Sequence, residues 1–191
     1  AQKNARITFA EDATAPRYQT DLLGSYQEKN AGGVVETIKE LQGFKVTKEH
    51  IKRGLLNVVK NTGMLGRWQI LGKNPSIICD TAHNKEGLQL VLEQLKRQNG
   101  KKLHIVLGFV DDKNVEQLLG LFPKKAKYYF VRPNVPRGFA AEELGKLALK
   151  NGLEGKIFKS VEKGLKKAMN TADKDDFIFV GGSTFVVAEV V

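Results

Sequence analysis

The stretch SIICDTAHN, residues 76–84, passes directly from an apolar pattern to a group of polar and ionisable side chains. Its apolar part, SIIC, predicts a buried strand, and Asp80 and His83 follow where that strand ends. Leucine and valine residues then recur with helical spacing, at positions i, i+3, i+4 and i+7. The residues on this helix face are Leu88, Val91, Leu92 and Leu95. The stretch therefore predicts a strand and a helix with reactive groups at their junction.

The alternation of apolar strands with amphipathic helices continues to the end of the chain. The predicted strands are SIIC, LHIVL, YYFV, KIF and FIFV, and the predicted helices cover residues 85–98, 112–122, 140–151, 160–172 and from about 184. The segment RWQIL is a candidate for one more strand before them. Strands interleaved with helices of this length predict a mainly parallel sheet covered on both faces. With right-handed crossovers, this is a doubly wound α/β domain.

The first sixty residues have a different pattern. RITF predicts a strand, YQTDLLGSYQEKN an irregular segment, and Asn30 the N-cap of a helix that Gly43 ends. A second helix is expected to start at Thr47. The apolar stripes of the two helices are Val34, Val35, Ile38 and Leu41, then Ile51, Leu55, Val58 and Val59. KNTGMLG marks a boundary, so we expect a first domain over 1–62, a linker over 63–66 and a second domain over 67–191.

The amino-acid composition excludes several classes of protein. With 41% hydrophobic and 27% charged residues the chain is typical of a globular protein, and its longest apolar runs are too short to cross a membrane. A single cysteine, Cys79, excludes an internal disulfide and favours a reducing cytoplasm and a packed, inert thiol. The net charge of +10 favours an anionic partner. No aromatic residues interleave with segments such as PKKAK, so we expect no specific nucleic-acid binding. The chain begins at Ala1, and we expect it to be a fragment of a longer protein and a monomer.

Four predicted strands end in segments that suit ligand binding, because ligands of open α/β sheets sit beyond the carboxyl ends of the strands. These segments are DTAHN, GFVDDKN, RPNVPRG and GGST. In the last of them, two glycines allow close backbone approach, and Ser183 and Thr184 open a helix whose free N–H groups could receive an anion. We expect all four segments to meet at one edge of the sheet.

Each segment also has a purely structural interpretation. Asp80 or Asn84 could serve only to cap the following helix, His83 could be a satisfied structural histidine, and GGST could be a tight turn with a serine cap. Arg67 could simply pack across the domain boundary.

No phosphate-binding fingerprint is complete in the chain. GRWQILGKN, residues 66–74, resembles a Walker A loop, but it has five residues between its glycines instead of four and lacks the closing Ser or Thr. A G-x-G-x-x-G pattern is also absent from the sequence, which disfavours a hydride-transferring Rossmann enzyme.

The segments YQEKN, GLLNVV…GRWQIL, DTAHN, GFVDDKN and GGSTFVVAEVV, in this order, resemble folylpolyglutamate synthase/dihydrofolate synthase of the Mur ligase superfamily. The resemblance extends over nearly all of the chain but covers only the later part of such an enzyme. It implies that residues 1–62 are the helical tail of the central ATPase domain and that residues 67–191 form the Rossmann-like C-terminal domain. The P-loop, the folate-binding loops and the Mg²⁺ ligands of the family are expected outside this chain, and no metal ligand is expected within it.

The resemblance also implies roles for individual residues. Asn30, Arg67 and Asp80 match ATP-binding residues, at the adenine side, at the phosphates and in the C-terminal domain. His83 and Ser183 match residues associated with the incoming glutamate.

Catalytic roles are expected for His83 and for Lys113, the residue of GFVDDKN that would meet anionic groups. The sequence departs from the family at Lys85, where a proline is usual, and at Asn114, which replaces an aspartate and puts any role of that position in doubt. Proline at a first helical position only pre-sets the backbone, so Asp80 and His83 should be unaffected.

The implied activity is ATP-dependent addition of L-glutamate to folate or dihydropteroate through an acyl phosphate, with ATP and Mg²⁺ required. By this account the fragment alone is inactive. Two alternatives remain open at this point: a cell-wall Mur ligase acting on a UDP-muramyl peptide, and a non-catalytic α/β module that binds nucleotides or nucleic acid.

Overall fold

The computed structural model describes residues 7–9, 17–98, 102–111 and 114–191. The chain divides into two compact units between Arg67 and Trp68. No helix in the described ranges is long and apolar enough to cross a lipid bilayer.

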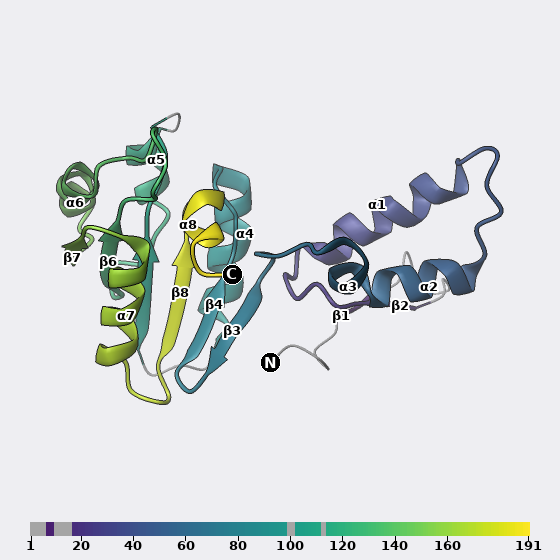
Figure 1. Cartoon of the computed structure of the whole chain (residues 1–191), viewed down its shortest axis with the longest axis horizontal. Coiled ribbons are helices and arrows are strands. Elements are labelled where there is room, and N and C mark those ends of the chain that lie inside the picture. The colour runs from purple at the N-terminus through teal and green to yellow at the C-terminus, as the bar shows by residue number, and fades with distance from the viewer. Residues whose placement is uncertain (1–6, 10–16, 99–101, 112–113) are drawn as a thin grey trace. The chain divides into compact units, whose positions relative to one another are not determined.

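The first unit combines a short antiparallel strand pair with helices (Figure 1). Its described elements are β1 (Ile7–Phe9), β2 (Tyr18–Thr20), α1 (Gln27–Lys39), α2 (Lys48–Leu56) and α3 (Val58–Thr62). Strand β2 lies in the segment that the sequence predicted to be irregular, so that prediction is wrong there. Tyr18 and Thr20 are buried while Gln19 between them is exposed, and an alternation over three residues is too short to be recognised as a strand.

Helix α1 begins earlier than predicted. The N-cap position belongs to Tyr26, and Asn30 lies inside the helix, where its side-chain amide donates to Gln27 Oε1 over 3.0 Å. The prediction of Asn30 as N-cap is therefore wrong. Acidic Glu28 in the first turn suits the positive end of the helix dipole and favours the earlier start. The buried face consists of Gln27, Ala31 and Val35, whereas the predicted stripe residues Val34 and Leu41 are 47% and 46% exposed.

The second predicted helix starts where expected but is interrupted. Thr47 is its N-cap, and a capping box forms in which Thr47 Oγ1 accepts from the His50 amide and His50 Nδ1 accepts from the Thr47 amide. The helix then breaks at Asn57 into α2 and α3. The Asp21 carboxylate, distant in sequence, accepts from the amides of Val58 and Val59 over 3.1 and 3.2 Å and so caps α3. Periodicity alone could not show this cap.

The second unit is built on a six-stranded sheet of order β3-β4-β8-β5-β6-β7. Its strands are β3 (Gln69–Lys73), β4 (Ser76–Cys79), β5 (Leu103–Leu107), β6 (Lys127–Val131), β7 (Gly155–Phe158) and β8 (Phe177–Gly181). All neighbours are parallel except β3 and β4, so the prediction of a mainly parallel sheet is confirmed. RWQIL does supply an extra strand, β3, and it is antiparallel. The last strand, β8, lies between β4 and β5.

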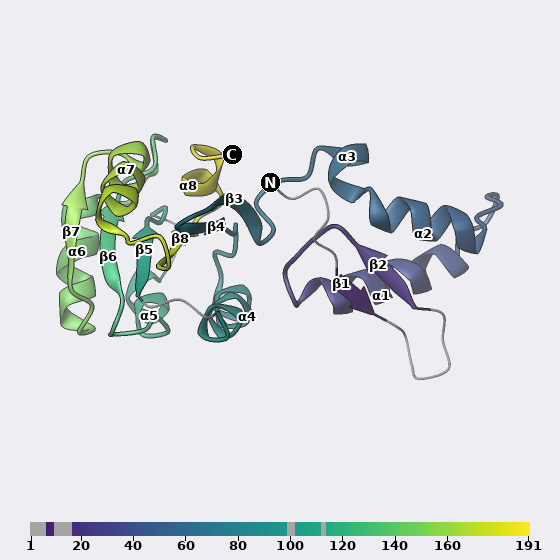
Figure 2. The same cartoon turned by 90° about the horizontal axis from the view of Figure 1, so that it is seen from below.

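Helices cover both faces of this sheet, as predicted. They are α4 (Lys85–Lys96), α5 (Val115–Leu119), α6 (Ala141–Lys150), α7 (Val161–Thr171) and α8 (Thr184–Ala188). Figure 2 shows α4 and α5 on one face of the sheet and α7 and α8 on the other. The helix predicted over 112–122 is shorter, because its regular part begins after the N-cap Asn114 and ends before Gly120.

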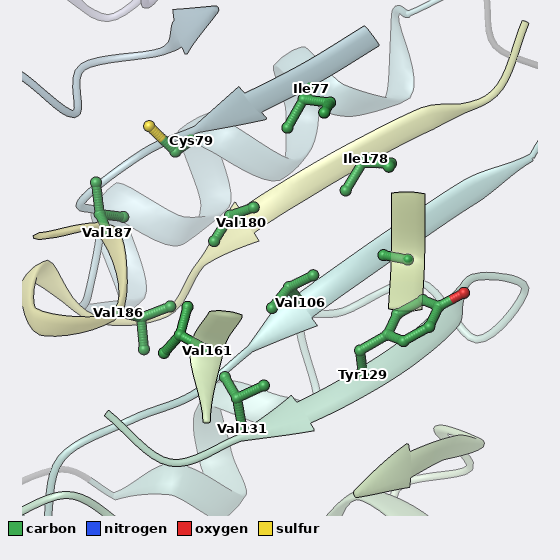
Figure 3. Close-up of a cluster of buried hydrophobic side chains, with 11 residues drawn as sticks. Ile77, Cys79, Val106, Tyr129, Val131, Val161, Ile178, Val180, Val186 and Val187 are labelled. Atoms are coloured by element: carbon green, nitrogen blue, oxygen red, sulfur yellow. The ribbon is translucent and has the colours of Figure 1, made fainter. Parts of the chain in front are cut away.

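The apolar core beneath α7 and α8 is formed by alternate residues of the central strands (Figure 3). Ile77 and Cys79 of β4 point to this face together with Val106, Ile178 and Val180 of the neighbouring strands. Each fully buried aliphatic side chain stabilises the fold by about 1.5–3 kcal/mol. Burial raises the pKa of Cys79 to about 12, so the thiol stays protonated and inert, as the sequence predicted.

A buried polar network lies at the amino end of the same sheet. His104 is fully buried, and its Nε2 lies 3.1 Å from Asp176 Oδ2 while its Nδ1 lies 2.9 Å from the Tyr129 hydroxyl. Although burial opposes ionisation, hydrogen bonds from the Asp173 amide and from His104 lower the pKa of Asp176. Because ionised Asp176 can only accept, Nε2 carries the proton, and neutral His104 accepts the Tyr129 hydrogen on Nδ1. No pattern in the sequence indicates this network.

The network predicts that acid destabilises the second unit. Burial lowers the pKa of His104 below the ordinary 6.5, so the unfolded chain binds more protons than the folded chain below that pH. The stabilisation is therefore complete above about pH 6.5 and decreases as the pH falls through the folded-state pKa. Urea unfolding followed by the fluorescence of buried Trp68 should show a lower free energy of unfolding at pH 5.0 than at pH 7.5.

His104→Gln should flatten this pH dependence, and His83→Gln, at an exposed histidine of the same unit, should preserve it. If the free energy of unfolding of His104→Gln fell between pH 7.5 and pH 5.0 as much as that of the unaltered chain, His104 would not be the cause of the pH dependence.

Candidate functional site

The loops after β4, β8 and β5 meet at the carboxyl edge of the sheet. The Asp80 amide donates to the Val180 carbonyl over 3.2 Å, and the Gly108 amide donates to the Gly181 carbonyl over 3.3 Å. A Cβ atom on Gly181 would lie 3.0 Å from the Asp80 carbonyl oxygen, and one on Gly182, whose φ is +94°, only 2.6 Å from the Gly108 carbonyl oxygen. Glycine is therefore required where these loops pack against one another.

Asp80 is buried at this edge and joins two backbone segments. Its Oδ2 accepts from the Trp68 amide over 2.8 Å, and its Oδ1 accepts from the Ala82 amide over 2.9 Å. Trp68 has a left-handed φ of 47°, a conformation that costs a bulky residue about 1–3 kcal/mol. The charge-assisted hydrogen bond that the Trp68 amide donates to Asp80 offsets that cost. The carboxylate thus fixes the point where the chain enters the second unit.

His83 and Asn84 follow Asp80 and have separate tasks. His83 is exposed, and its Nδ1 lies 2.9 Å from the Thr81 carbonyl oxygen. Since a carbonyl only accepts, Nδ1 carries the proton, and Nε2 is the basic atom of the neutral ring. Asn84 caps α4 by accepting from the Gly87 amide over 2.9 Å, so the structural interpretation of Asn84 is confirmed.

Ser183 follows β8, the strand next to β4, and is 2% exposed. Its Oγ accepts from the Phe185 amide over 3.2 Å and caps α8, which confirms the predicted cap. The hydroxyl hydrogen is not used in that bond. Asp80 and Ser183 therefore lie at one edge of the sheet.

Arg137 reaches the same region from the loop after β6. Its guanidinium carbon lies 5.1 Å from the centre of the Phe185 ring, at the start of α8. The loops after β5 and β6 are joined by backbone hydrogen bonds from Asp111 to Arg137 and from Phe139 to Phe109. The sequence pattern placed RPNVPRG, with Arg132 and Arg137, among the strand ends that suit ligand binding, but it assigned Arg137 no individual role.

Lys113 lies outside the described residues. The neighbouring Asn114 caps α5 by accepting from the Gln117 amide over 3.3 Å.

Asn30 and Arg67, which are distant in sequence, line one cavity of the first unit. This cavity has a volume of about 650 Å³, within the range of small-ligand sites. Its wall is largely apolar, with Val34, Ile51 and Leu55 among its residues. Asn30 is exposed and Arg67 is half-buried. The cavity thus offers an apolar wall, an amide and a guanidinium, which suit a flat base that carries phosphates. Among the residues that the structure describes, no three His, Cys, Asp or Glu side chains gather as a metal site would need.

Known proteins match this chain along nearly its whole length. A probable bifunctional folylpolyglutamate synthase/dihydropteroate synthase of Haloferax volcanii is 31% identical over 188 residues, which cover 98% of this chain and 22% of that protein. The structure of Escherichia coli FolC in complex with DHPP and ADP has a TM-score of 0.72 and 27% identity, over 84% of this chain and 37% of that one.

A bifunctional folylpolyglutamate synthase/dihydrofolate synthase with Mn, AMPPNP and L-glutamate bound has a TM-score of 0.71 and 27% identity, over 84% of this chain and 38% of that one. The chain thus spans between a fifth and two fifths of the length of these relatives.

The family of the second unit follows from its sequence. Residues 66–184 match the family described as Mur ligase, glutamate ligase domain, and this range contains Asp80, His83 and Ser183. The match covers more than half of the chain and begins at the boundary between the two units. The chain therefore belongs to the Mur ligase family, through its glutamate ligase domain.

Proposed function

We propose that this chain is the C-terminal part of an ATP-dependent ligase that joins L-glutamate to folate or dihydropteroate. The observation that carries the proposal is the 31% identity, over 98% of the chain, to a probable bifunctional folylpolyglutamate synthase/dihydropteroate synthase. Asp80 and Ser183 lie at one edge of the matched domain. One of the similar structures contains ADP, and another contains Mn, AMPPNP and L-glutamate, which fit a reaction that uses ATP, a divalent metal ion and glutamate. We also propose that the complete protein is a cytoplasmic monomer.

The cavity of the first unit is the proposed site of the nucleotide. The apolar residues around Ile51 and Leu55 would pack against the flat base, and the Asn30 amide can both donate to and accept from its edge. The Arg67 guanidinium would pair with phosphate oxygens, for which its planar fork is suited. Asp80 is proposed to support nucleotide binding by holding Trp68, the residue that follows Arg67.

The proposed reaction has two steps. An acceptor carboxylate oxygen attacks the γ-phosphorus of ATP, and ADP leaves. The glutamate amine then attacks the acyl carbon, inorganic phosphate leaves, and one proton is released from the nitrogen. His83 Nε2 is the atom available to take this proton, since Nδ1–H is held by the Thr81 carbonyl. The hydroxyl hydrogen of Ser183 would be donated to a carboxylate of the incoming glutamate.

Cations are needed because ATP, acceptor and glutamate are all anionic. Lys113 is proposed to stabilise the charge that develops on the transferred phosphoryl group. Mg²⁺ usually binds through one or two carboxylates together with the substrate phosphates. We propose that its protein ligands lie outside this chain. When bound, the ion would neutralise charge on the phosphate oxygens.

The acceptor is tested most directly in the complete protein that contains this chain. Purified enzyme with ATP, Mg²⁺ and labelled glutamate should form one amide product with dihydropteroate or folate and none with a UDP-muramyl peptide. Release of ADP in equal amount to the product should accompany the reaction. Product from the UDP-muramyl peptide, with none from folate or dihydropteroate, would overturn the folate assignment but not membership of the family.

Arg67→Gln should weaken use of ATP in the same assay. Loss of a charged hydrogen bond costs about 1.5–3 kcal/mol, which predicts a decrease in kcat/KM for ATP of roughly 10- to 100-fold. Arg53→Gln is the matched control, because Arg53 is an exposed arginine of α2 that does not line the cavity. Equal kinetics for the two variants would remove Arg67 from the nucleotide site.

A further inference from the structure

A cavity of about 590 Å³ opens at the amino ends of the neighbouring strands β6 and β7. The segment PKKAK, residues 123–127, leads into β6 there and supplies three of the cavity's lysines. The five lysines that line it are Lys124, Lys125, Lys127, Lys156 and Lys167. Because the strands are parallel, this cavity and the candidate site, which lies at the carboxyl ends, are at opposite edges of the sheet.

The lining of this lysine cavity is strongly unbalanced in charge. The lining contains five lysines and one carboxylate, Glu154, which together give it a formal charge of +4. By contrast, a cavity of about 690 Å³ near the loop after β6 is lined by two cations, Arg132 and Lys159, and two carboxylates, Glu162 and Glu189. The nucleotide cavity of the first unit has one permanently charged residue, Arg67.

Among the described residues, none of the five ammonium groups takes part in an ion pair such as those of Lys39 with Glu36 and Lys102 with Asp173. Lys167 lies on α7 outside its last turn, so the helix dipole does not account for it. The other four lie on the loop before β6, on β6 and on β7. Like charges around one concavity repel each other, and a bound anion would relieve that repulsion.

The aromatic floor of the cavity is buried and offers no stacking surface. Tyr128 and Tyr129 line it but are only 2% and 4% exposed. Their hydroxyls are already bonded, to the Pro123 carbonyl and to His104. Nucleic-acid bases bind single-strand sites by stacking on exposed aromatic rings, which these residues do not provide. The volume is within the range of small-ligand sites.

We propose that the lysine cavity binds a compact polyanion with three or more negative charges, an oligophosphate or an oligocarboxylate. This site is separate from the proposed ligase chemistry and does not depend on it. Several ammonium groups around one ligand favour multiple charges over a single phosphate or carboxylate.

Titration calorimetry of the 191-residue chain with tripolyphosphate, tricarballylate and orthophosphate tests this site. Either tripolyphosphate or tricarballylate should bind at one site per chain, at least tenfold more tightly than orthophosphate. Its affinity should fall as the NaCl concentration is raised. Comparing tripolyphosphate with tricarballylate decides between phosphate and carboxylate as the ligand group.

The matched variants each remove three charges. Lys124→Gln/Lys127→Gln/Lys156→Gln should lower the affinity for the more tightly bound anion by about tenfold or more. The loss is of this size because each exposed ion pair contributes modestly and three are removed. The control, Lys96→Gln/Lys146→Gln/Lys163→Gln, changes exposed lysines outside the cavity and should shift the affinity less than threefold.

Three results would overturn the proposal. Equal weakening in both triple variants would show general electrostatic attraction, and equal affinity for orthophosphate would show no preference for a polyanion. Tighter binding of a single-stranded oligonucleotide than of either small anion would indicate a nucleic-acid surface instead. Circular dichroism melting of both variants establishes that each is folded.

Discussion

The candidate site in the second unit depends on the hydrogen bonds that the buried carboxylate of Asp80 accepts. It is held where β4 ends, and its two oxygens accept from the amides of Trp68 and Ala82. One side chain thereby fixes the entrance of the chain into the unit and the loop that carries His83. A buried carboxylate without hydrogen-bond partners would be costly, and these two hydrogen bonds offset that cost. The residue that the family resemblance assigns to ATP is thus also a structural support.

The parallel arrangement could be predicted from sequence because short apolar strands alternate regularly with helices that have strong local signals. Caps such as Thr47, Asn84 and Ser183 were also predictable, since each bonds to a backbone amide two or three residues away. What could not be predicted depends on contacts between distant residues. Asp21 divides one periodic helix into α2 and α3, and the insertion of β8 between β4 and β5 leaves no local trace.

The location of the candidate site could be predicted from the sequence better than the contacts that its residues make. Strand ends identified the edge that holds Asp80 and Ser183, because carboxyl ends of parallel strands coincide. The sequence could not show that Asp80 uses both oxygens on backbone amides or that Arg137 lies over Phe185. Both facts depend on how loops fold back on one another. The lysine cavity is a similar case, since its residues come from two loops, two strands and a helix that are far apart in the sequence.

Amide hydrogen exchange of the 191-residue chain tests the role of Asp80 most directly. In Asp80→Ala, exchange at Trp68 and Ala82 should accelerate by roughly 10- to 100-fold, as expected for loss of a charged hydrogen bond, while the amides of β5 and β6 stay protected. Asp111→Ala, at an exposed aspartate after β5, should leave both amides unchanged. Unaltered protection of Trp68 and Ala82 in Asp80→Ala would contradict the account.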